Sequence, residues 1–299
     1  MLTDMSTPLN RASTIAPVMS AFAAGTALGP AIGGFLVDSV GLNPTFYVVG
    51  FSYLGVAALN RAILKETKMR TIHFPWQKPS PESTKPKSLY EASQEAVGQW
   101  VPLMRDKNVR NIMAMNGLYW VALAGSQMTL LPLLLTDSTG LNFSATQVGQ
   151  VYMGMSLIQI VGNPVFAKLI DQIGKAPAIV GGCSLISASM AALPFCQDPL
   201  QLAGVLGLWA MGSSMLSTAP IAFLSDHVSE ESRAQAIALL RTCGDVGFLI
   251  GATGVGALAD VTGMGVAMQS TSALLFTATA WFATRQVLSN KIKDSPTTK

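Results

Sequence analysis

The sequence predicts an all-α protein that crosses a membrane several times, and three observations lead to this fold class. Hydrophobic residues make up 50% of the chain and charged residues 12%, whereas charged residues form about a quarter of an average soluble domain. Eight long apolar segments follow one another, and each can cross a bilayer because about 20 helical residues span about 30 Å. Lys and Arg residues occur at only one side of the alternating connections.

The predicted membrane helices divide the chain into four parts. Residues 1–64 form a helical pair, 65–110 a central cytoplasmic loop, 111–288 a six-helix bundle and 289–299 a cytoplasmic tail. The part of the loop from Pro75 to Lys87 is rich in Pro and polar residues, which predicts an extended segment without a core of its own. The eight helices are placed at Ser13 to Val37, Thr45 to Leu64, Ile112 to Leu135, Val148 to Ile170, Ala176 to Phe195, Leu200 to Leu224, Ala234 to Leu258 and Val266 to Ala283.

The distribution of basic residues predicts the orientation of the chain. Basic loops stay preferentially on the cytoplasmic side of a membrane. We therefore expect both termini and the loop 65–110 in the cytoplasm, while the sequence does not indicate which membrane holds the protein. The net charge of +3 follows from this topology and does not indicate nucleic-acid binding. None of the 19 Lys and Arg residues lies in Asp38 to Pro44, Thr136 to Gln147, Cys196 to Pro199 or Ala259 to Gly265.

Enzymatic and metal-binding functions find no support in the residue pattern. Cys183 and Cys243 fall inside apolar segments and Cys196 at the end of one, so they indicate no disulfide framework. His73 and His227 lie in loops, without the spacing of metal ligands. No nucleophile motif or phosphate-binding loop accompanies them. We therefore expect no catalytic residue, no metal and no cofactor.

The chain also contains an internal repeat. When the sequence is shifted against itself by 222 residues, several Asp, Arg and Gly residues fall on residues of the same type. A parallel repeat of this size in a helical membrane protein is typical of a duplicated transporter. The matched pairs are Asp4 and Asp226, Arg11 and Arg233, Gly25 and Gly247, Gly29 and Gly251, Gly34 and Gly256, and Asp38 and Asp260.

Two motifs resemble those of the major facilitator superfamily. Residues 25–34, GTALGPAIGG, are similar to the fifth-helix motif of this family, which is associated with proton-coupled exporters, although Ala16 stands where its long form has a further Gly. Residues 167–175, AKLIDQIGK, are similar to the loop motif between helices eight and nine, with Ala167 and Gln172 in place of the usual Gly and basic residue. The resemblance covers essentially the whole chain. It implies a bundle equivalent to helices five to twelve of the twelve family helices.

The resemblance implies that the chain lacks the first four family helices, which hold a proton-coupling motif and much of one cavity wall. It implies a secondary-active transporter that exports a small organic solute or drug, coupled to protons, by alternating access. The partners would be the lipid bilayer, the substrate, protons and a chain that supplies the missing helices. The alternative is a non-transporting membrane protein, either a truncated relic or an interaction partner, that keeps part of the transporter fold.

The loop motif supplies candidate gate residues. In the family its acid latches the two halves together, which implies this role for Asp171, next to Gly174 and Lys175. The nearest pseudo-symmetric target is the N-terminus of the helix that starts at Ser13. That helix end offers unpaired N–H groups and a partial positive charge, so it attracts a carboxylate.

Small residues predict close helix packing. Ala21, Gly25, Gly29 and Gly33 recur every four residues, just before Gly34, and Cys243, Gly247 and Gly251 do the same in the repeat. Small faces let membrane helices approach closely, because lipid gives them no hydrophobic drive to associate. Two interpretations remain open for them: packing alone, or a bend at Gly29 and Pro30 where the two halves slide during transport.

Asp245 is the ionisable residue that lies deepest in a predicted membrane helix. An Asp at mid-helix costs about 2.5 to 3.5 kcal/mol on insertion scales, so it should face protein or water and is a functional candidate. Arg241, one turn earlier, lies on the same helix face, whereas the repeat has Met19 and Ala23 at these positions. Three interpretations remain: an intrahelical pair whose Arg reaches the cytoplasm, coupling to protons or substrate, and a lipid-facing position.

Polar and aromatic residues in three other helices are the candidates for a cavity wall. Each alone is more often a helix-to-helix hydrogen bond, worth about 0.6 kcal/mol on average, than a ligand contact. Together they predict a neutral to amphipathic cavity with one buried acid. The set comprises Asn116, Tyr119, Trp120, Gln127, Gln150, Gln159, Asn163, Trp209, Ser213 and Ser217.

Overall fold

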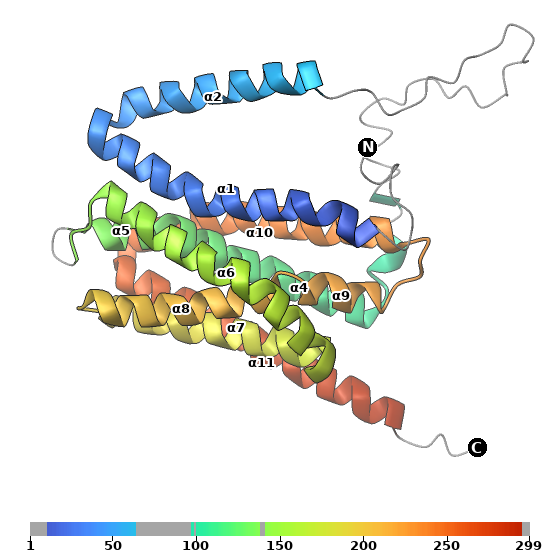
Figure 1. The fold of residues 1–299 in the computed structure, drawn as a ribbon. Coiled ribbons are helices and arrows are strands. Elements are labelled where there is room, and N and C mark those ends of the chain that lie inside the picture. The colour runs from blue at the N-terminus through green and yellow to red at the C-terminus, as the bar shows by residue number, and fades with distance from the viewer. Residues whose placement is uncertain (1–10, 64–96, 99, 138–140, 295–299) are drawn as a thin grey trace, which may run out of the picture.

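The computed structural model describes residues 11–63, 97–98, 100–137 and 141–294, without the side chains of 11–23, 26 and 288–294. Most of the predicted loop 65–110 and the end of the predicted tail therefore lie outside the described residues. All regular structure in the described residues is helical (Figure 1), which confirms the all-α class.

The helices follow the predicted segments and extend beyond most of them. Within the described residues, six runs are long and apolar enough to cross a membrane: Leu42–Ile63, Lys107–Thr136, Ala145–Ile173, Lys175–Phe195, Pro199–Ser225 and Arg233–Thr262. The predicted number of eight membrane helices stays a prediction. The elements are α1 (Arg11–Val40), α2 (Leu42–Ile63), α4 (Lys107–Ala122), η1 (Leu123–Leu130), α5 (Leu131–Thr136), α6 (Ala145–Ile173), α7 (Lys175–Ala192), η2 (Leu193–Phe195), α8 (Pro199–Leu216), α9 (Ala219–Ser225), α10 (Arg233–Thr262) and α11 (Met264–Asp294).

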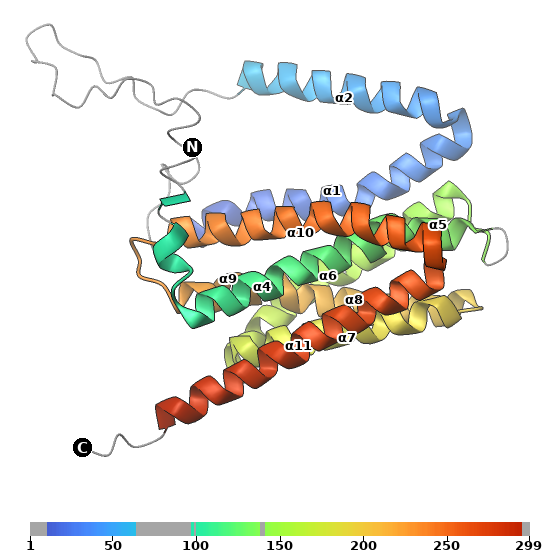
Figure 2. The same cartoon turned by 180° about the vertical axis from the view of Figure 1, so that it is seen from behind.

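The segments from α4 to α11 form one bundle, and α1 packs along its side against α6. Within the bundle, α10 packs on α4 and η1, and α7 lies between α8 and α11. Trp209 and Phe282 are fully buried in the core. The helix α2 diverges from the rest in both views (Figures 1 and 2), and of its residues only Thr45 is buried.

Capping residues and glycines set the helix boundaries near the site. The carboxylate of Asp106 accepts hydrogen bonds from the N–H groups of Asn108 (2.7 Å) and Val109 (3.0 Å), which starts α4. The turn between α6 and α7 has Gly174 at φ +93°, and Gly41 (+87°) and Gly263 (+88°) join α1 to α2 and α10 to α11. Glycine tolerates this left-handed conformation. Because Gly41 and Gly263 are 222 residues apart, the repeat extends to the turns.

Two of the predicted helices are interrupted. The segment Ile112 to Leu135 contains η1, a π-helix, and the segment Leu200 to Leu224 is divided into α8 and α9. A proline accounts for each change, since its ring removes one backbone donor and clashes with the carbonyl four residues before it. Pro132 is the second residue after η1, and Pro220 lies at the start of α9.

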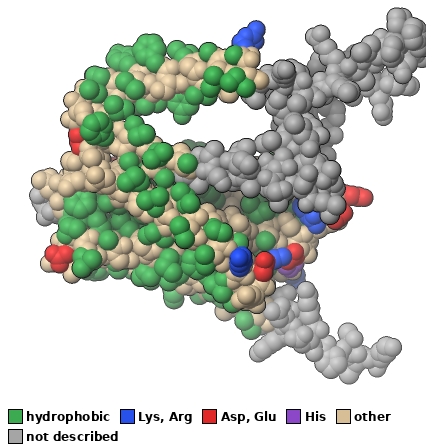
Figure 3. Space-filling view, in the orientation of Figure 1, with side chains coloured by type: hydrophobic (Ala, Val, Ile, Leu, Met, Phe, Trp, Pro, Cys, Tyr) green, Lys and Arg blue, Asp and Glu red, His purple; other side chains and the backbone are tan. Residues whose placement is uncertain are grey.

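Charge is segregated along the bundle as the sequence predicts. On the face in Figure 3, hydrophobic side chains cover the middle, and Lys and Arg side chains gather toward one end. That end holds the start of α1 and the end of α11, whereas the charged side chains visible at the opposite end on this face are acidic. The cytoplasmic assignment of the basic end stays a prediction.

Candidate functional site

A buried contact joins α4, α7 and α8 in the middle of the bundle. Tyr119 on α4 lies beside Ser213 on α8 and Cys183 on α7. Cys183 is 1% exposed and Ser213 9% exposed. The Ser213 hydroxyl nevertheless forms no hydrogen bond of normal geometry with the described residues. Two predicted cavity residues, Tyr119 and Ser213, are therefore brought together around a polar atom that is unsatisfied.

The predicted residues Asn116 and Trp120 face α10. The Asn116 side chain donates a hydrogen bond to the carbonyl of Leu240 (2.9 Å), so its amide is occupied in holding α4 to α10. The Trp120 ring lies 6.3 Å from that of Phe248. A Cβ at Gly244 would lie 2.8 Å from the Trp120 ring, and the small residue thus gives the indole its space.

The π-helix η1 places a third set of polar atoms in the bundle. The Ser126 hydroxyl and the Gln127 side-chain oxygen are buried and have no partner among the described residues. Tyr152 of α6 donates its hydroxyl to the backbone carbonyl of Gln127, and Thr129 donates to the carbonyl of Ala124 (3.0 Å). π-Helical turns are frequent at functional sites. Tyr152 was not among the predicted residues, because its only signal in the sequence is a hydroxyl group in an apolar segment.

The other members of the predicted set differ in how deeply they are buried and in whether they form hydrogen bonds. Trp209 is fully buried and Asn163 partly buried, and each keeps a polar atom without a hydrogen-bond partner in the described part of the chain. Gln159 is partly buried. Ser217 is exposed and donates to the carbonyl of Ser214 (2.7 Å). A cavity of about 430 Å³ between α6 and α8 shares only Gln150 with the predicted set.

Replacing Ser213 by alanine should leave the free energy of unfolding almost unchanged. Its hydroxyl forms no hydrogen bond of normal geometry with the described residues, so the change removes none. The control is Ser272→Ala, because Ser272 is buried and donates to the carbonyl of Ser187 (2.7 Å) across two helices. That variant should lose about 0.5 to 1.5 kcal/mol. Thermal unfolding in detergent measures both, and an equal loss would show that Ser213 is hydrogen-bonded.

Asp245 and Arg241 differ from the prediction of one buried acid. Both are exposed, and no ion pair joins them in the described structure. The reason is the register of α10, whose residues Gly244, Gly247 and Gly251 face α4. The neighbouring position 245 is rotated by about 100° from this face. Asp245 therefore lies at the surface of the described chain, and its role stays a prediction.

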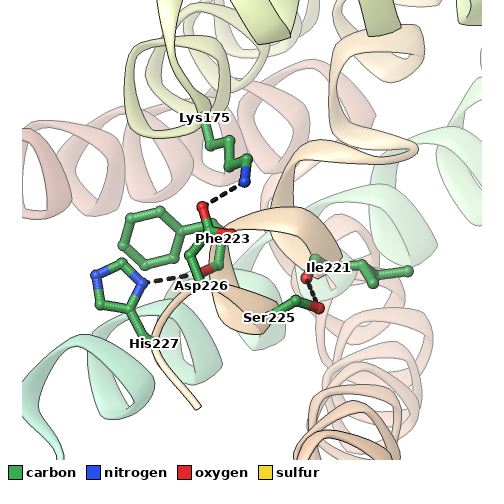
Figure 4. Close-up of polar contacts among 6 residues, drawn as sticks. All are labelled: Lys175, Ile221, Phe223, Ser225, Asp226 and His227. Carbon is green, nitrogen blue, oxygen red and sulfur yellow. Dashed lines mark hydrogen bonds and ion pairs between the residues drawn. The ribbon is translucent and has the colours of Figure 1, made fainter. Parts of the chain in front are cut away.

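One predicted gate residue, Lys175, forms a polar contact within the six-helix bundle. Lys175, at the start of α7, forms an ion pair with Asp226 at the end of α9 (Figure 4). Beside it, His227 stacks on Phe223 with ring centroids 4.4 Å apart. Exposed ion pairs contribute about 0 to 1 kcal/mol. Asp171 is exposed, and the side chains at the start of α1 lie outside the described ones, so the predicted latch stays a prediction.

The glycine motif packs through a different face of α1 than expected. Within 4 Å of a Cβ built at Gly25, Gly29 or Gly33, the described chain has no other atom. A Cβ at Gly34 would instead overlap the carbonyl of Ala145, on α6. The packed face is rotated by one residue, because it begins at the buried Ala27 and continues at intervals of three and four residues.

The equivalent glycines of α10 do make the expected close contacts. A Cβ at Gly247 would overlap the carbonyl of Gly117, and one at Gly251 the carbonyl of Val121. On α1, Pro30 belongs to the packed face, since a Cβ at Gly149 of α6 would overlap its carbonyl. Figures 1 and 2 show α1 bending in its second half, which contains this proline. A proline is a recognised cause of such bends.

Comparison with known proteins decides the family. The family model of the Major Facilitator Superfamily matches residues 1–142 and 112–297. The chain belongs to this superfamily. The resemblance seen in the motifs is thereby confirmed, and the chain is an integral, multi-pass membrane protein of a transporter family.

Two relatives are similar to different extents of the chain. An uncharacterized MFS-type transporter of Methanocaldococcus jannaschii, MJ1560, is 28% identical over 249 residues, which are 82% of this chain and 58% of that protein. A probable vesicular acetylcholine transporter-A of Danio rerio is 29% identical over 96 residues, 31% of this chain and 19% of that protein.

A solved major facilitator structure shows the same fold. The crystal structure of the human organic anion transporter MFSD10 (TETRAN) superposes with a TM-score of 0.65 at 17% identity, covering 94% of this chain and 66% of that one. The chain thus spans about three fifths of the archaeal relative and two thirds of the human structure.

Proposed function

We propose that the protein is a secondary-active transporter that moves a small organic solute by alternating access, coupled to protons and in the direction of export. The observation that carries this proposal is a group of buried polar atoms without hydrogen-bond partners among the described residues, which lie on the predicted cavity residues Gln127, Asn163, Trp209 and Ser213 and on Ser126. Unsatisfied polar atoms are costly inside a membrane bundle. Water or a polar solute that reaches them recovers this cost.

The residues around these atoms favour an amphipathic solute. Tyr119 and Trp120 are in contact at 5.7 Å between ring centroids, and Phe248 extends the aromatic group toward α10. Neutral hydroxyl and amide groups supply the polar contacts. A wall of this kind suits a solute with an apolar body and a few hydrogen-bonding groups. The names of two relatives, an organic anion transporter and a probable vesicular acetylcholine transporter, also support an organic solute.

Flux measurements in proteoliposomes test the proposal. The purified chain is reconstituted, a pH gradient is imposed, and uptake of a panel of radiolabelled organic cations, anions and neutral amphipaths is followed. We expect uptake of one class above that of protein-free vesicles, abolished by a protonophore. Uptake equal to that of protein-free vesicles for every class would support the alternative of a non-transporting protein. Uptake that persists with the protonophore would contradict proton coupling.

A further inference from the structure

The end of the bundle without basic residues is held by a contact that spans two distant parts of the chain. Asp38, in the last turn of α1, accepts a hydrogen bond from the backbone N–H of Thr146 at 2.7 Å. Thr146 is the second residue of α6. The side chains of Thr146 and Ser144 and the backbone of Ala145 also contact the carboxylate. The contact therefore joins the helical pair of the N-terminal part to the six-helix bundle.

The first turn of α6 offers N–H groups that its own residues do not fill. Ser144 and Gln147 form a capping box, in which the Ser144 hydroxyl accepts from the N–H of Gln147 and the Gln147 side chain accepts from the N–H of Ser144. The N–H of Thr146 is left for an outside acceptor, and the helix dipole favours a negative one. Asp38 supplies this acceptor, so the two caps complement each other.

The packing below Asp38 forces the two helices together. Gly34 of α1 lies against the carbonyl of Ala145, and Gly149 of α6 lies against the carbonyl of Pro30. On α1, the residues Pro30, Gly34 and Asp38 follow one another at intervals of four and therefore lie on one face of the helix. The backbones of the two helices are thus in close contact at Gly34 and Gly149. The Asp38 carboxylate lies beyond these contacts, at the outer end of the interface. A separation of α1 from α6 at this end must therefore break the Asp38 contact.

We propose that Asp38 is a latch, which caps the N-terminus of α6 across the interface and keeps the end of the bundle that lacks basic residues closed. The latch is a positioning contact and binds no substrate. Its release would be part of the movement that opens this end, and it is independent of which solute the protein carries.

The groups around the latch make it insensitive to pH near neutrality. The other charged residue of α1 is Arg11, and those of α6 are Lys168 and Asp171, all toward the opposite end. The other charged residues in the helix ends and turns at the latch end are all acidic, namely Asp137, Asp198 and Asp260. The hydroxyl and N–H of Thr146 hold the pKa of the Asp38 carboxyl below its usual value. Stability from this contact is present above the ordinary pKa and is lost as the pH falls through the lowered one.

A distance measurement in the full chain tests the latch. Spin labels are placed at Val40 and Gln150, both exposed, after Cys183, Cys196 and Cys243 are replaced by serine. Double electron–electron resonance in lipid nanodiscs then measures the distances between the two labels. The ratio of long to short distances reports how often α1 and α6 are separated at this end. Asp38→Ala should raise this ratio about two- to five-fold, the typical effect of a charge at a helix N-terminus. Asp38→Asn should raise it less, because its amide oxygen can still accept.

Removing the donor gives an independent variant. Thr146→Pro deletes the N–H at a first-turn position where proline is tolerated, and should match Asp38→Ala. The double variant, Asp38→Ala with Thr146→Pro, should have no larger effect than either single change.

Asp260→Ala is the control, since Asp260 occupies the equivalent position of the repeat and has no such contact in the described structure. Unchanged distances in Asp38→Ala, or effects that add in the double variant, would overturn the latch. The readout needs no substrate, so it is separate from the test of transport.

Discussion

Gly251→Ala should lower the free energy of unfolding by about 1 to 3 kcal/mol, the usual cost of overpacking a tight interface. A Cβ at this position would overlap the carbonyl oxygen of Val121 and lie 2.7 Å from its Cα. Both are backbone atoms, so no side chain can rotate away. The two helices must separate, and the contact between α10 and α4 is loosened along its length.

The matched control for Gly251→Ala lies one turn further along the same helix. A Cβ at Gly254 would have no other described atom within 4 Å, and alanine is favoured over glycine in a helix by about 1 kcal/mol. Gly254→Ala should therefore keep or raise stability. Thermal unfolding of the purified protein in detergent compares the two variants. A loss in Gly254→Ala as large as that in Gly251→Ala would contradict the role of the close helix contact.

Asp245→Asn should abolish proton-driven uptake, with a decrease of about tenfold or more, corresponding to at least about 1.4 kcal/mol in the barrier. The amide keeps the shape of the side chain but cannot take up a proton. Because Asp245 is exposed and has no described ion pair, the same change should leave the unfolding temperature nearly unchanged. Uptake with and without a pH gradient, measured in parallel with unfolding, checks both parts.

Arg241→Gln is the control for this prediction. It removes the nearest predicted partner of Asp245 on the same helix face, and proton-driven uptake should persist in it. If Asp245→Asn protein kept its pH dependence, the coupling role would be excluded. If the protein instead became unstable and the double change with Arg241→Gln restored it, the two residues would form the intrahelical pair that the sequence also allows.

Much of the fold could be predicted because its signals are local. The thickness of the bilayer sets the length of each apolar segment, and the orientation in the membrane sets which turns lack basic residues. Both features can be recognised in the sequence without knowing which helices pack against each other. The turns at Gly41 and Gly263 are 222 residues apart and therefore agree with the internal repeat, which can also be recognised in the sequence alone. The motif of residues 25–34 likewise identified the family.

The candidate site was harder to predict because its contacts depend on partners far away in the chain. The glycine pattern indicated a small face on α1, but only the position of α6 shows that Gly34 is the packed glycine and Gly25 is not. Asn116 was predicted as a cavity residue, and only the position of α10 shows that its side chain forms a helix-to-helix hydrogen bond. The exposure of Asp245 depends on how α10 is rotated against α4, and the acceptor role of Asp38 depends on how α1 lies against α6. No local sequence pattern contains either arrangement.

The packing of α1 on α6 also determines an order of assembly in the cell. Ala145 follows Gly34 by 111 residues, which takes a ribosome roughly 5 to 20 seconds at about 5 to 20 residues per second. During that time α1 resides in the membrane with its partner not yet made. Its packing face, which contains Pro30 and Gly34, must then be shielded by lipid, by α2 or by the insertion machinery. The biogenesis of this protein therefore includes a waiting period that ends when the first turn of α6 enters the bilayer.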